Sequence, residues 1–325
     1  MAYDYKRYFG EITTLHDLTT RSEDRTWQLA VPADAPGPHA IVLYLGCNVL
    51  RTAHLVQTVT AVFDRLGLDY IAVGGPTYCC GIVHHQQGDT DAAGRINDHT
   101  LSLFERYQPE EVVMWCPSCI YFFDEIRQTQ FPFRVRHTTE FLVSQLPRVQ
   151  FTKRTEATLA LHAHSVGEAR QREAEAAQTL LKAVPGLRYT EVDPEPRFGQ
   201  SCTPAVQQQL GVSGWKNLVS AEIAKAKESG AGTLATLYHS CQREICGFED
   251  ESIKVEHYLT VFARALGIEF EDKFKKYRLW QDPQRILADA SPCQIANDID
   301  PQKAESLVTT MFGASKGAAA KDSPS

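Results

Sequence analysis

The chain has 325 residues, of which 43% are hydrophobic, so it can form two ordinary domains or one double domain with a full core. Its net charge of −7 argues against a nucleic-acid-binding protein, because such proteins are usually basic. No stretch reaches the roughly 18 apolar residues that a membrane span needs, and the first residues, MAYDYKRYFGEI, lack the apolar core of a secretory signal. We therefore expect a cytoplasmic protein, or one held at the inner face of the membrane by a partner.

The first 39 residues are expected to form an N-terminal arm and linker. Three prolines in the segment VPADAPGPH argue against a helix at the end of this region. The tyrosines of the arm, Tyr3, Tyr5 and Tyr8, fit either a surface for a partner or a cover for the chain's own core.

Strand and helix patterns alternate in the segments that follow. The apolar run AIVLYLGC at 40–47 predicts a buried strand, and a helix pattern covers residues 50–66. LDYIAV at 68–73 and EVVMW at 111–115 predict two further strands, with a helix over residues 91–107 between them. This alternation predicts an α/β fold with a parallel sheet covered by helices.

The second half of the chain repeats the first. GLDYIAV at 67–73 matches GLRYTEV at 186–192, and MWCPSC at 114–119 matches TLYHSC at 236–241, so the offsets are 119 and 122 residues. We therefore expect an internal duplication that produces two pseudo-symmetric α/β halves, each a small, mostly parallel sheet flanked by helices.

The expected organisation follows from this repeat. Two segments near the C-terminus, DPQRILADA and DPQKAESLVTTMF, predict helices that begin at an Asp–Pro pair, and the small, polar end of the chain predicts disorder. The expected parts are an arm and linker at 1–39, a first half at 40–150, a second half at 151–270, a helical extension at 271–312 and a disordered tail at 313–325.

Nine cysteines in a cytosolic chain favour metal binding or catalysis over structural disulfides. Five of them follow the ends of the three strands predicted in the first half, and the carboxyl ends of parallel strands meet at one edge of a sheet. Two adjacent cysteines can converge only on an irregular turn, for which the glycine after them supplies the backbone freedom. The five are Cys47, Cys79, Cys80, Cys116 and Cys119.

Three chemistries fit these five cysteines. A zinc ion is satisfied by four ligands, so five thiolates exceed what it needs. An iron–sulfur cluster disperses the charge of its thiolates over several irons. A thiol/disulfide redox pair is the third alternative. The number of thiols favours the iron–sulfur cluster and leaves the other two open.

A spaced cysteine followed by CCG and then CxxC is the signature of the cysteine-rich CCG-domain family. The segments YLGC, CCG, CPSC and VEHYLTVFARALG resemble the B subunit of heterodisulfide reductase and its relatives over about residues 40–270. The resemblance implies that the five cysteines of the first half hold one noncubane 4Fe–4S cluster, which transfers electrons to or from a disulfide or thiol.

The same resemblance implies partners. One is a 4Fe–4S protein similar to the C subunit of that enzyme, and another is a flavin protein similar to its A subunit. In sulfur oxidation, a carrier of lipoate or persulfide is a further implied partner.

His84, which follows the CCG turn, is the candidate catalytic residue, as a proton donor to a departing thiolate. Two functions other than sulfur chemistry also remain open. One is an electron relay in a quinone-linked dehydrogenase, and the other is a non-enzymatic interaction module stabilised by zinc.

The second half departs from the cysteine pattern. The repeat assigns the positions of the five thiols to Ser165, Ser201, Cys202, Tyr238 and Cys241. Only two of these are cysteines, so we do not expect a second noncubane cluster. A zinc ion or a smaller cluster is one hypothesis, and a scaffold with simply buried cysteines is the other. The candidate ligands are Cys202, Cys241, Cys246 and His239, with His162 and His164 as alternatives to His239.

Overall fold

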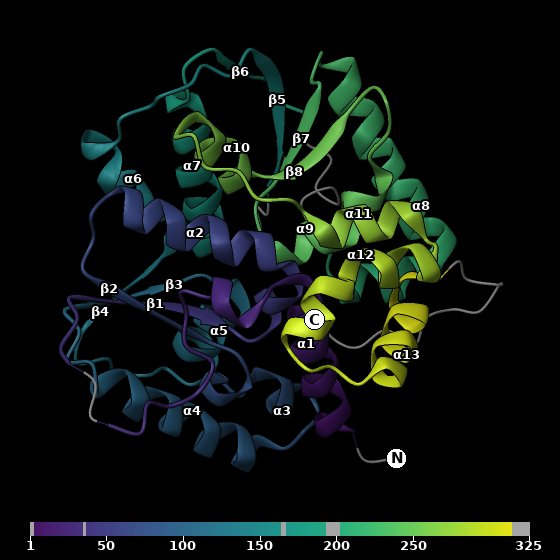
Figure 1. Cartoon of the computed structure of the whole chain (residues 1–325). Helices are drawn as coiled ribbons and strands as arrows, with labels where there is room; N and C mark the ends of the chain where they lie inside the picture. Colours follow the sequence, from purple (N-terminus) through teal and green to yellow (C-terminus); the bar gives the residue numbers. More distant parts are fainter. Residues whose placement is uncertain (1–2, 35–36, 164–166, 193–201, 314–325) are drawn as a thin grey trace. The chain divides into compact units, whose positions relative to one another are not determined.

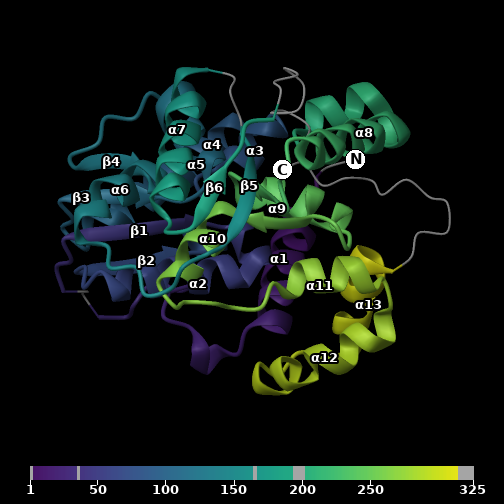
Figure 2. The same cartoon turned by 90° about the horizontal axis from the view of Figure 1, so that it is seen from above.

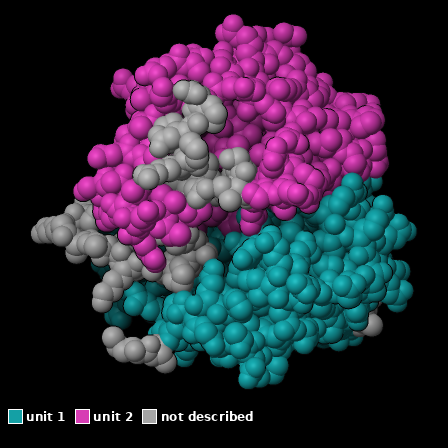
Figure 3. All heavy atoms as spheres, turned by 180° about the vertical axis from the view of Figure 1, so that it is seen from behind, with its two compact units in different colours: residues 1–138, 272–324 teal, residues 139–271, 325 magenta. Residues whose placement is uncertain are grey.

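The structure is a computed structural model, and it separates into two compact units (Figure 3). The first unit comprises residues 1–138 and 272–324, and the second comprises residues 139–271. No helix in the described part of the chain is both long and apolar enough to cross a lipid bilayer. The residues that the structure describes are 3–34, 37–163, 167–192 and 202–313.

The first unit is built on a four-stranded parallel sheet. Its strands are β1 (Ile41–Gly46), β2 (Tyr70–Gly74), β3 (Glu111–Met114) and β4 (Arg134–His137). The segments between them form η2 (Asn48–Thr52), α2 (Ala53–Arg65), η3 (Pro76–Tyr78), α3 (Ile82–Gln86), α4 (Thr90–Glu105), α5 (Pro117–Tyr121) and η4 (Phe122–Ile126). The strand order is β2-β1-β3-β4. Strand β1 is a continuous apolar run because helices cover both faces of the sheet, with α2 on one face and α3 and α4 on the other (Figure 1).

The second unit repeats this arrangement. Its strands are β5 (Ala157–His162), β6 (Leu187–Tyr189), β7 (Thr233–Thr236) and β8 (Lys254–His257), in the order β6-β5-β7-β8. Its helices are α7 (Glu168–Ala183), α8 (Pro204–Glu228), α9 (His239–Ile245) and α10 (Tyr258–Ala265), and α6 (Thr138–Gln145) begins at the unit boundary. Helices α7 and α10 pack together on one side of the strands, and α8 lies on the other (Figure 1). The predicted α/β fold with two pseudo-symmetric halves is therefore confirmed.

The strand registers identify equivalent residues in the two halves. Tyr44 in β1 pairs with Met114, the last residue of β3. His162 in β5 pairs with Thr236, the last residue of β7. Tyr44 and His162 therefore occupy the same register position in the two sheets.

The N-terminal segment contains α1 (Tyr5–Thr19), whose first turn is capped by Asp4 through a hydrogen bond from the backbone of Arg7. One face of α1 is buried, including Tyr8 and Ile12. Of the two roles considered for the tyrosines of this segment, the burial of Tyr8 supports a cover for the chain's own core.

Two C-terminal helices, α12 (Pro283–Ala296) and α13 (Pro301–Phe312), complete the first unit by packing on α1 (Figures 1 and 2). Helix α11 (Lys273–Trp280) packs on both of them. Asn297 links the two ends of the chain: its side chain donates to the carbonyl oxygens of Asp17 (2.6 Å) and Thr20 (2.8 Å) and accepts from the backbone of Ser22 (2.8 Å). Helices α12 and α13 begin at Asp–Pro pairs as predicted. The tail beyond residue 313 lies outside the described residues.

Two glycines near α3 have a similar left-handed backbone, but only one of them lies in close contact with a neighbouring helix. Gly81 has φ +97°, and a Cβ atom there would lie 2.5 Å from the carbonyl oxygen of Ala93 in α4. Gly88 has a similar φ of +83°, but a Cβ atom there would meet nothing within 4 Å. Only Gly81 therefore needs both backbone freedom and the absence of a side chain.

We expect Gly88→Ala to lower the free energy of unfolding by about 1 kcal/mol, because of its left-handed backbone. Gly81→Ala is expected to lower it by about 2–4 kcal/mol, because overlap with Ala93 is added. Thermal unfolding of the reduced, metal-free protein measures both effects, at roughly 2–4 °C for each kcal/mol. Equal shifts of the melting temperature in the two variants would show that the overlap with Ala93 does not affect stability.

Candidate metal centre

The structure places the five cysteines of the first half at the carboxyl edge of the first sheet. Cys47 follows β1, the adjacent pair Cys79 and Cys80 follows η3 after β2, and the CxxC pair Cys116 and Cys119 follows β3. All five side chains are buried, with exposed fractions between 1% and 6%. Three loops distant in sequence thus contribute to one site, as expected for parallel strands.

Contacts between side chains join the five thiols into a continuous series. Cys47 hydrogen-bonds to Cys79, and Cys79 to Cys80. Cys80 then contacts Cys119, which contacts Cys116. Among the described residues, the compact group of three ligand atoms within 4.8 Å of one another lies in the second unit. The five thiols of the first unit therefore form an extended series and not a tight site for a single ion.

Burial and crowding oppose the simultaneous ionisation of these thiols. The hydrogen bond that Cys47 donates to Cys79, together with burial, raises the pKa of Cys47. Contacts with Cys116 and Cys80, together with burial, raise the pKa of Cys119. The pKa of Cys79 is lowered because Cys47 and Cys80 both donate to it. These directions favour the thiolate of Cys79 and oppose ionisation of Cys47 and Cys119, so added positive charge is needed to ionise the whole series.

Two residues of β1 shape the site beneath the thiols. Gly46 has φ +76°, and a Cβ atom there would lie 3.1 Å from both the Sγ of Cys119 and the Cβ of Cys116. Its lack of a side chain therefore lets the CxxC loop approach the strand. Tyr44 is fully buried and donates to the carbonyl oxygen of Tyr78 (2.7 Å), and burial, followed by the nearby thiols, raises its pKa.

Helix α4 holds the backbone of the adjacent cysteine pair. Thr100 donates to the carbonyl oxygen of Cys79 (2.5 Å), and Asn97 donates to that of Cys80 (3.1 Å). Both donors are completely buried, so these bonds satisfy carbonyl groups that water does not reach. The backbone N–H of Gly81 points to the Sγ of Cys79 at 3.4 Å. The irregular turn predicted for two adjacent cysteines is thus fixed by one neighbouring helix.

The donor set of the first unit fits an iron–sulfur cluster better than a single zinc ion. All five donors are sulfur atoms, and they are spread along an extended series. Several iron ions would supply the positive charge that buried thiolates require, whereas one zinc ion takes only four ligands. The residues that would hold such a cluster are Cys47, Cys79, Cys80, Cys116 and Cys119.

A pocket of about 340 Å³ reaches one of these thiols. Its polar lining includes Cys79, His84 and two residues one turn apart on α4, Arg95 and His99, and its apolar lining includes Phe9. Sequence reasoning singled out His84 but neither α4 residue, although their spacing of four residues places them on one helix face.

The imidazole of His84 is held in place at this pocket. It stacks on the ring of Tyr5, with ring centroids 4.0 Å apart and an interplanar angle of 9°. His84 is half-buried and close enough to Cys79 to contribute to the lowered pKa of that thiol. The sequence-predicted catalytic residue therefore lines the pocket together with a candidate ligand, Cys79.

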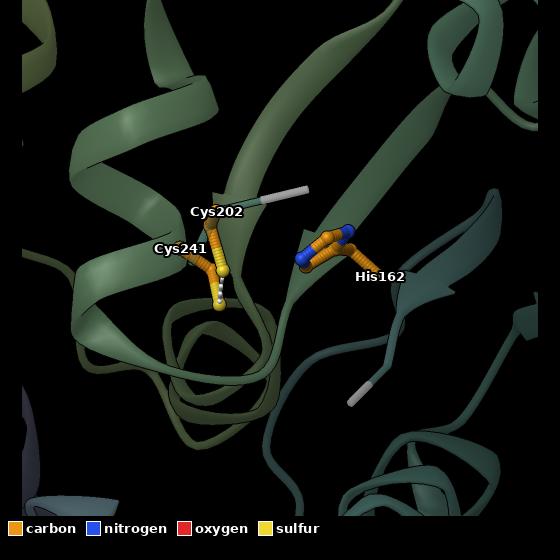
Figure 4. A group of neighbouring side chains, drawn as sticks. All are labelled: His162, Cys202 and Cys241. Carbon is orange, nitrogen blue, oxygen red and sulfur yellow. Dashed lines mark hydrogen bonds between the residues drawn. The ribbon is translucent and has the colours of Figure 1, made fainter. Parts of the chain in front are cut away.

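In the second unit, Cys202 and Cys241 lie beside His162 at the carboxyl end of β5 (Figure 4). The two sulfur atoms are 2.8 Å apart. The Nδ1 of His162 lies 2.5 Å from a carboxylate oxygen of Glu222 in α8. Burial disfavours the charged imidazole, but Glu222 and Cys241 outweigh it and raise the pKa of His162 to about 10. Glu222 is 60 residues from His162, and no sequence pattern pointed to it.

The other residues predicted for this half lie elsewhere. His239 and Cys246 are buried but do not belong to the compact group, and the Sγ of Cys246 donates to the carbonyl oxygen of Arg243 (3.7 Å). Tyr238 is buried and donates through its hydroxyl to Glu173. Three further residues considered from the sequence lie outside the described residues: His164, Ser165 and Ser201.

Comparison with known proteins agrees with the location of the cysteine site. The family model of the cysteine-rich domain, CCG, matches residues 41–124. This match covers the first sheet up to β3 and all five candidate ligands of the first unit.

Curated relatives extend the similarity beyond this domain. The D subunit of dihydromethanophenazine:CoB–CoM heterodisulfide reductase from Methanosarcina acetivorans is 22% identical over 71% of this chain, and its counterpart from Methanosarcina mazei is 21% identical over 70%. The chain spans about 60% of the length of these relatives. The chain therefore carries a cysteine-rich CCG domain and is similar, over about seven tenths of its length, to the D subunit of heterodisulfide reductase.

Proposed function

We propose that this chain is an iron–sulfur electron-transfer subunit of a heterodisulfide-reductase-like complex. On this proposal the five cysteines of the first unit hold a noncubane 4Fe–4S cluster, and a disulfide or thiol substrate reaches it through the pocket beside Cys79. The observation that carries the proposal is that a candidate ligand lines an open pocket. A centre buried on all sides would suit an electron relay, whereas this pocket gives a substrate sulfur a route of access. The similarity to relatives named for a heterodisulfide supports the same substrate class.

Reduction of a disulfide consumes two electrons and two protons and yields two thiols, and thiol oxidation is the reverse. When bound, the cluster would supply one-electron transfer beside the pocket. The electrons would come from a partner iron–sulfur protein similar to the C subunit of heterodisulfide reductase, with a flavin protein beyond it. His84 would hold a proton at the pocket for the departing thiolate, in the orientation that Tyr5 imposes.

The charge of the pocket supports an anionic substrate. The guanidinium of Arg95 and the imidazole of His99 line it from α4. We propose that they bind a carboxylate or phosphate group of the substrate, because a guanidinium pairs well with both. A carrier-bound lipoate or a persulfide is the alternative sulfur substrate.

Replacing a proposed ligand is expected to remove the cluster. The wild-type protein, purified anaerobically, should contain about four iron and four sulfide per chain. Cys80→Ser should contain less than a quarter of this iron and lack the cluster's EPR signal, because its thiolate is central in the series.

Cys293→Ser is the matched control, since Cys293 is also buried in the first unit but lies in α12, outside the thiol series. It should keep the iron content and EPR spectrum of the wild type. An unchanged spectrum in Cys80→Ser, or wild-type protein that contains zinc without sulfide, would refute the cluster assignment.

Removing the positive charge of Arg95 is expected to weaken the binding of anionic substrates selectively. Arg95→Gln should raise KM for dithiodiglycolate, a dicarboxylate disulfide, about tenfold, which corresponds to about 1.4 kcal/mol, and leave kcat unchanged. KM for the neutral bis(2-hydroxyethyl) disulfide should not change. Anaerobic turnover with a reduced viologen dye as electron donor measures both parameters.

Arg65→Gln serves as the control, because Arg65 is exposed at the end of α2 and does not line the pocket. An equal rise of KM for the two disulfides in Arg95→Gln, or no rise for either, would contradict the assigned role of Arg95.

A further inference from the structure

We propose that the second unit binds a single zinc ion through the Nε2 of His162 and the Sγ atoms of Cys202 and Cys241. His162 is the last residue of β5, Cys202 lies two residues before α8, and Cys241 lies in the first turn of α9. Their ligand atoms lie within 4.8 Å of one another, and all three side chains are buried. Two thiolates and one imidazole are donors that zinc prefers, and three protein ligands leave one position open to a water or thiolate.

The repeat explains how these residues come together. Cys202 and Cys241 correspond to Cys80 and Cys119, which are in contact with each other in the first unit. His162 corresponds to Tyr44, which lies beside the thiols of the first unit. The second half thus retains one pair of contacting thiols and has a histidine where the first half has a tyrosine. The result is a mixed nitrogen and sulfur donor set.

Glu222 supports a metal at this position. It is buried in α8, and its carboxylate engages the Nδ1 of His162 at 2.5 Å. This contact fixes the ring and leaves Nε2 as the nitrogen that faces the metal, and Figure 4 shows one ring nitrogen directed toward the two sulfur atoms. A carboxylate bound to the second nitrogen of a metal-ligating histidine is the usual arrangement in zinc sites.

The dimensions of the group favour one ion over a cluster. An ordinary 4Fe–4S cluster takes four protein ligands and the cluster proposed for the first unit takes five, whereas this group offers three within a small volume. Tetrahedral zinc sites hold two sulfurs about 3.8 Å apart, so the pair at 2.8 Å needs to open by only about 1 Å. A divalent cation would also balance the charge of two buried thiolates, which lie close to the buried carboxylate of Glu222.

Metal analysis of the full chain tests this proposal. Protein produced in zinc-supplemented medium and purified under reducing, anaerobic conditions should contain about one zinc per chain. Cys202→Ser and Cys241→Ser should each lose at least nine tenths of this zinc. Cys246→Ser is the matched control, because Cys246 is equally buried in the same unit but lies outside the group. It should keep its zinc.

Two further measurements keep the test independent of folding and of the cluster in the first unit. Glu222→Gln retains every ligand and should weaken zinc binding about 10–100-fold against a competing chelator. Cys80→Ser should lose iron and keep zinc, so failure of the cluster assignment is distinguishable from failure of this one.

Three outcomes would overturn the zinc site. The first is full zinc content in both Cys202→Ser and Cys241→Ser. The second is wild-type protein that binds neither zinc nor cobalt, with no thiolate-to-cobalt charge-transfer band. The third is a thiol titration of the denatured, unreduced wild-type chain that finds two thiols fewer than its nine cysteines supply, because Cys202 and Cys241 would then be a disulfide.

Discussion

Thiolates repel one another, and burial at the edge of β1, β2 and β3 removes the water that would screen their charges. The rest of the first unit accommodates this constraint. Gly46 lets the CxxC loop approach, and Asn97 and Thr100 satisfy the carbonyl groups of the adjacent cysteines. These contacts hold the thiols in place but do not neutralise the charge of their thiolates. Cations between the sulfur atoms would allow all of them to ionise, so the cluster proposed for this site and the local fold would depend on each other.

The two halves show how one topology supports different donor sets. Both sheets have the same strand order, so the loops at their carboxyl ends occupy equivalent positions. The first half fills them with five sulfur donors, and the second combines two sulfurs with the imidazole of His162. The end of a strand fixes where a side chain lies, whereas the chemistry of that side chain depends on the type of residue at the position. Duplication followed by changes at a few positions is therefore sufficient to convert an extended thiol series into a compact mixed group.

Apolar runs, the alternation of strand and helix patterns and the internal repeat predicted much of the fold from sequence alone. A buried parallel strand such as β1 is a continuous apolar run, and Asp–Pro pairs begin helices α12 and α13. The meeting of the cysteine loops follows from the same topology. Contacts between distant side chains were not predictable. The sequence named His239 as a candidate ligand, with His162 and His164 as alternatives, but could not choose between them. Among the described residues His162 joins Cys202 and Cys241, whereas His239, two residues from Cys241 on a helix, does not face the same way. The positions of Glu222 and of the two α4 donors, Asn97 and Thr100, result from packing between elements. Such packing leaves no local pattern in the sequence.

The link made by Asn297 has a consequence for synthesis on the ribosome. The first unit needs residues from both ends of the chain, whereas the second unit lies entirely between them. Because domains generally fold as units in the order of their synthesis, the second unit can be complete before α12 and α13 emerge. Until then α1 lacks its partner helices, and Arg51 and His54, just after Cys47, lack their contacts with Met311 and Asp272. The nascent chain thus has an interval in which the cysteine loops are already made and the C-terminal helices are not yet packed on α1, so the first unit is completed after the second.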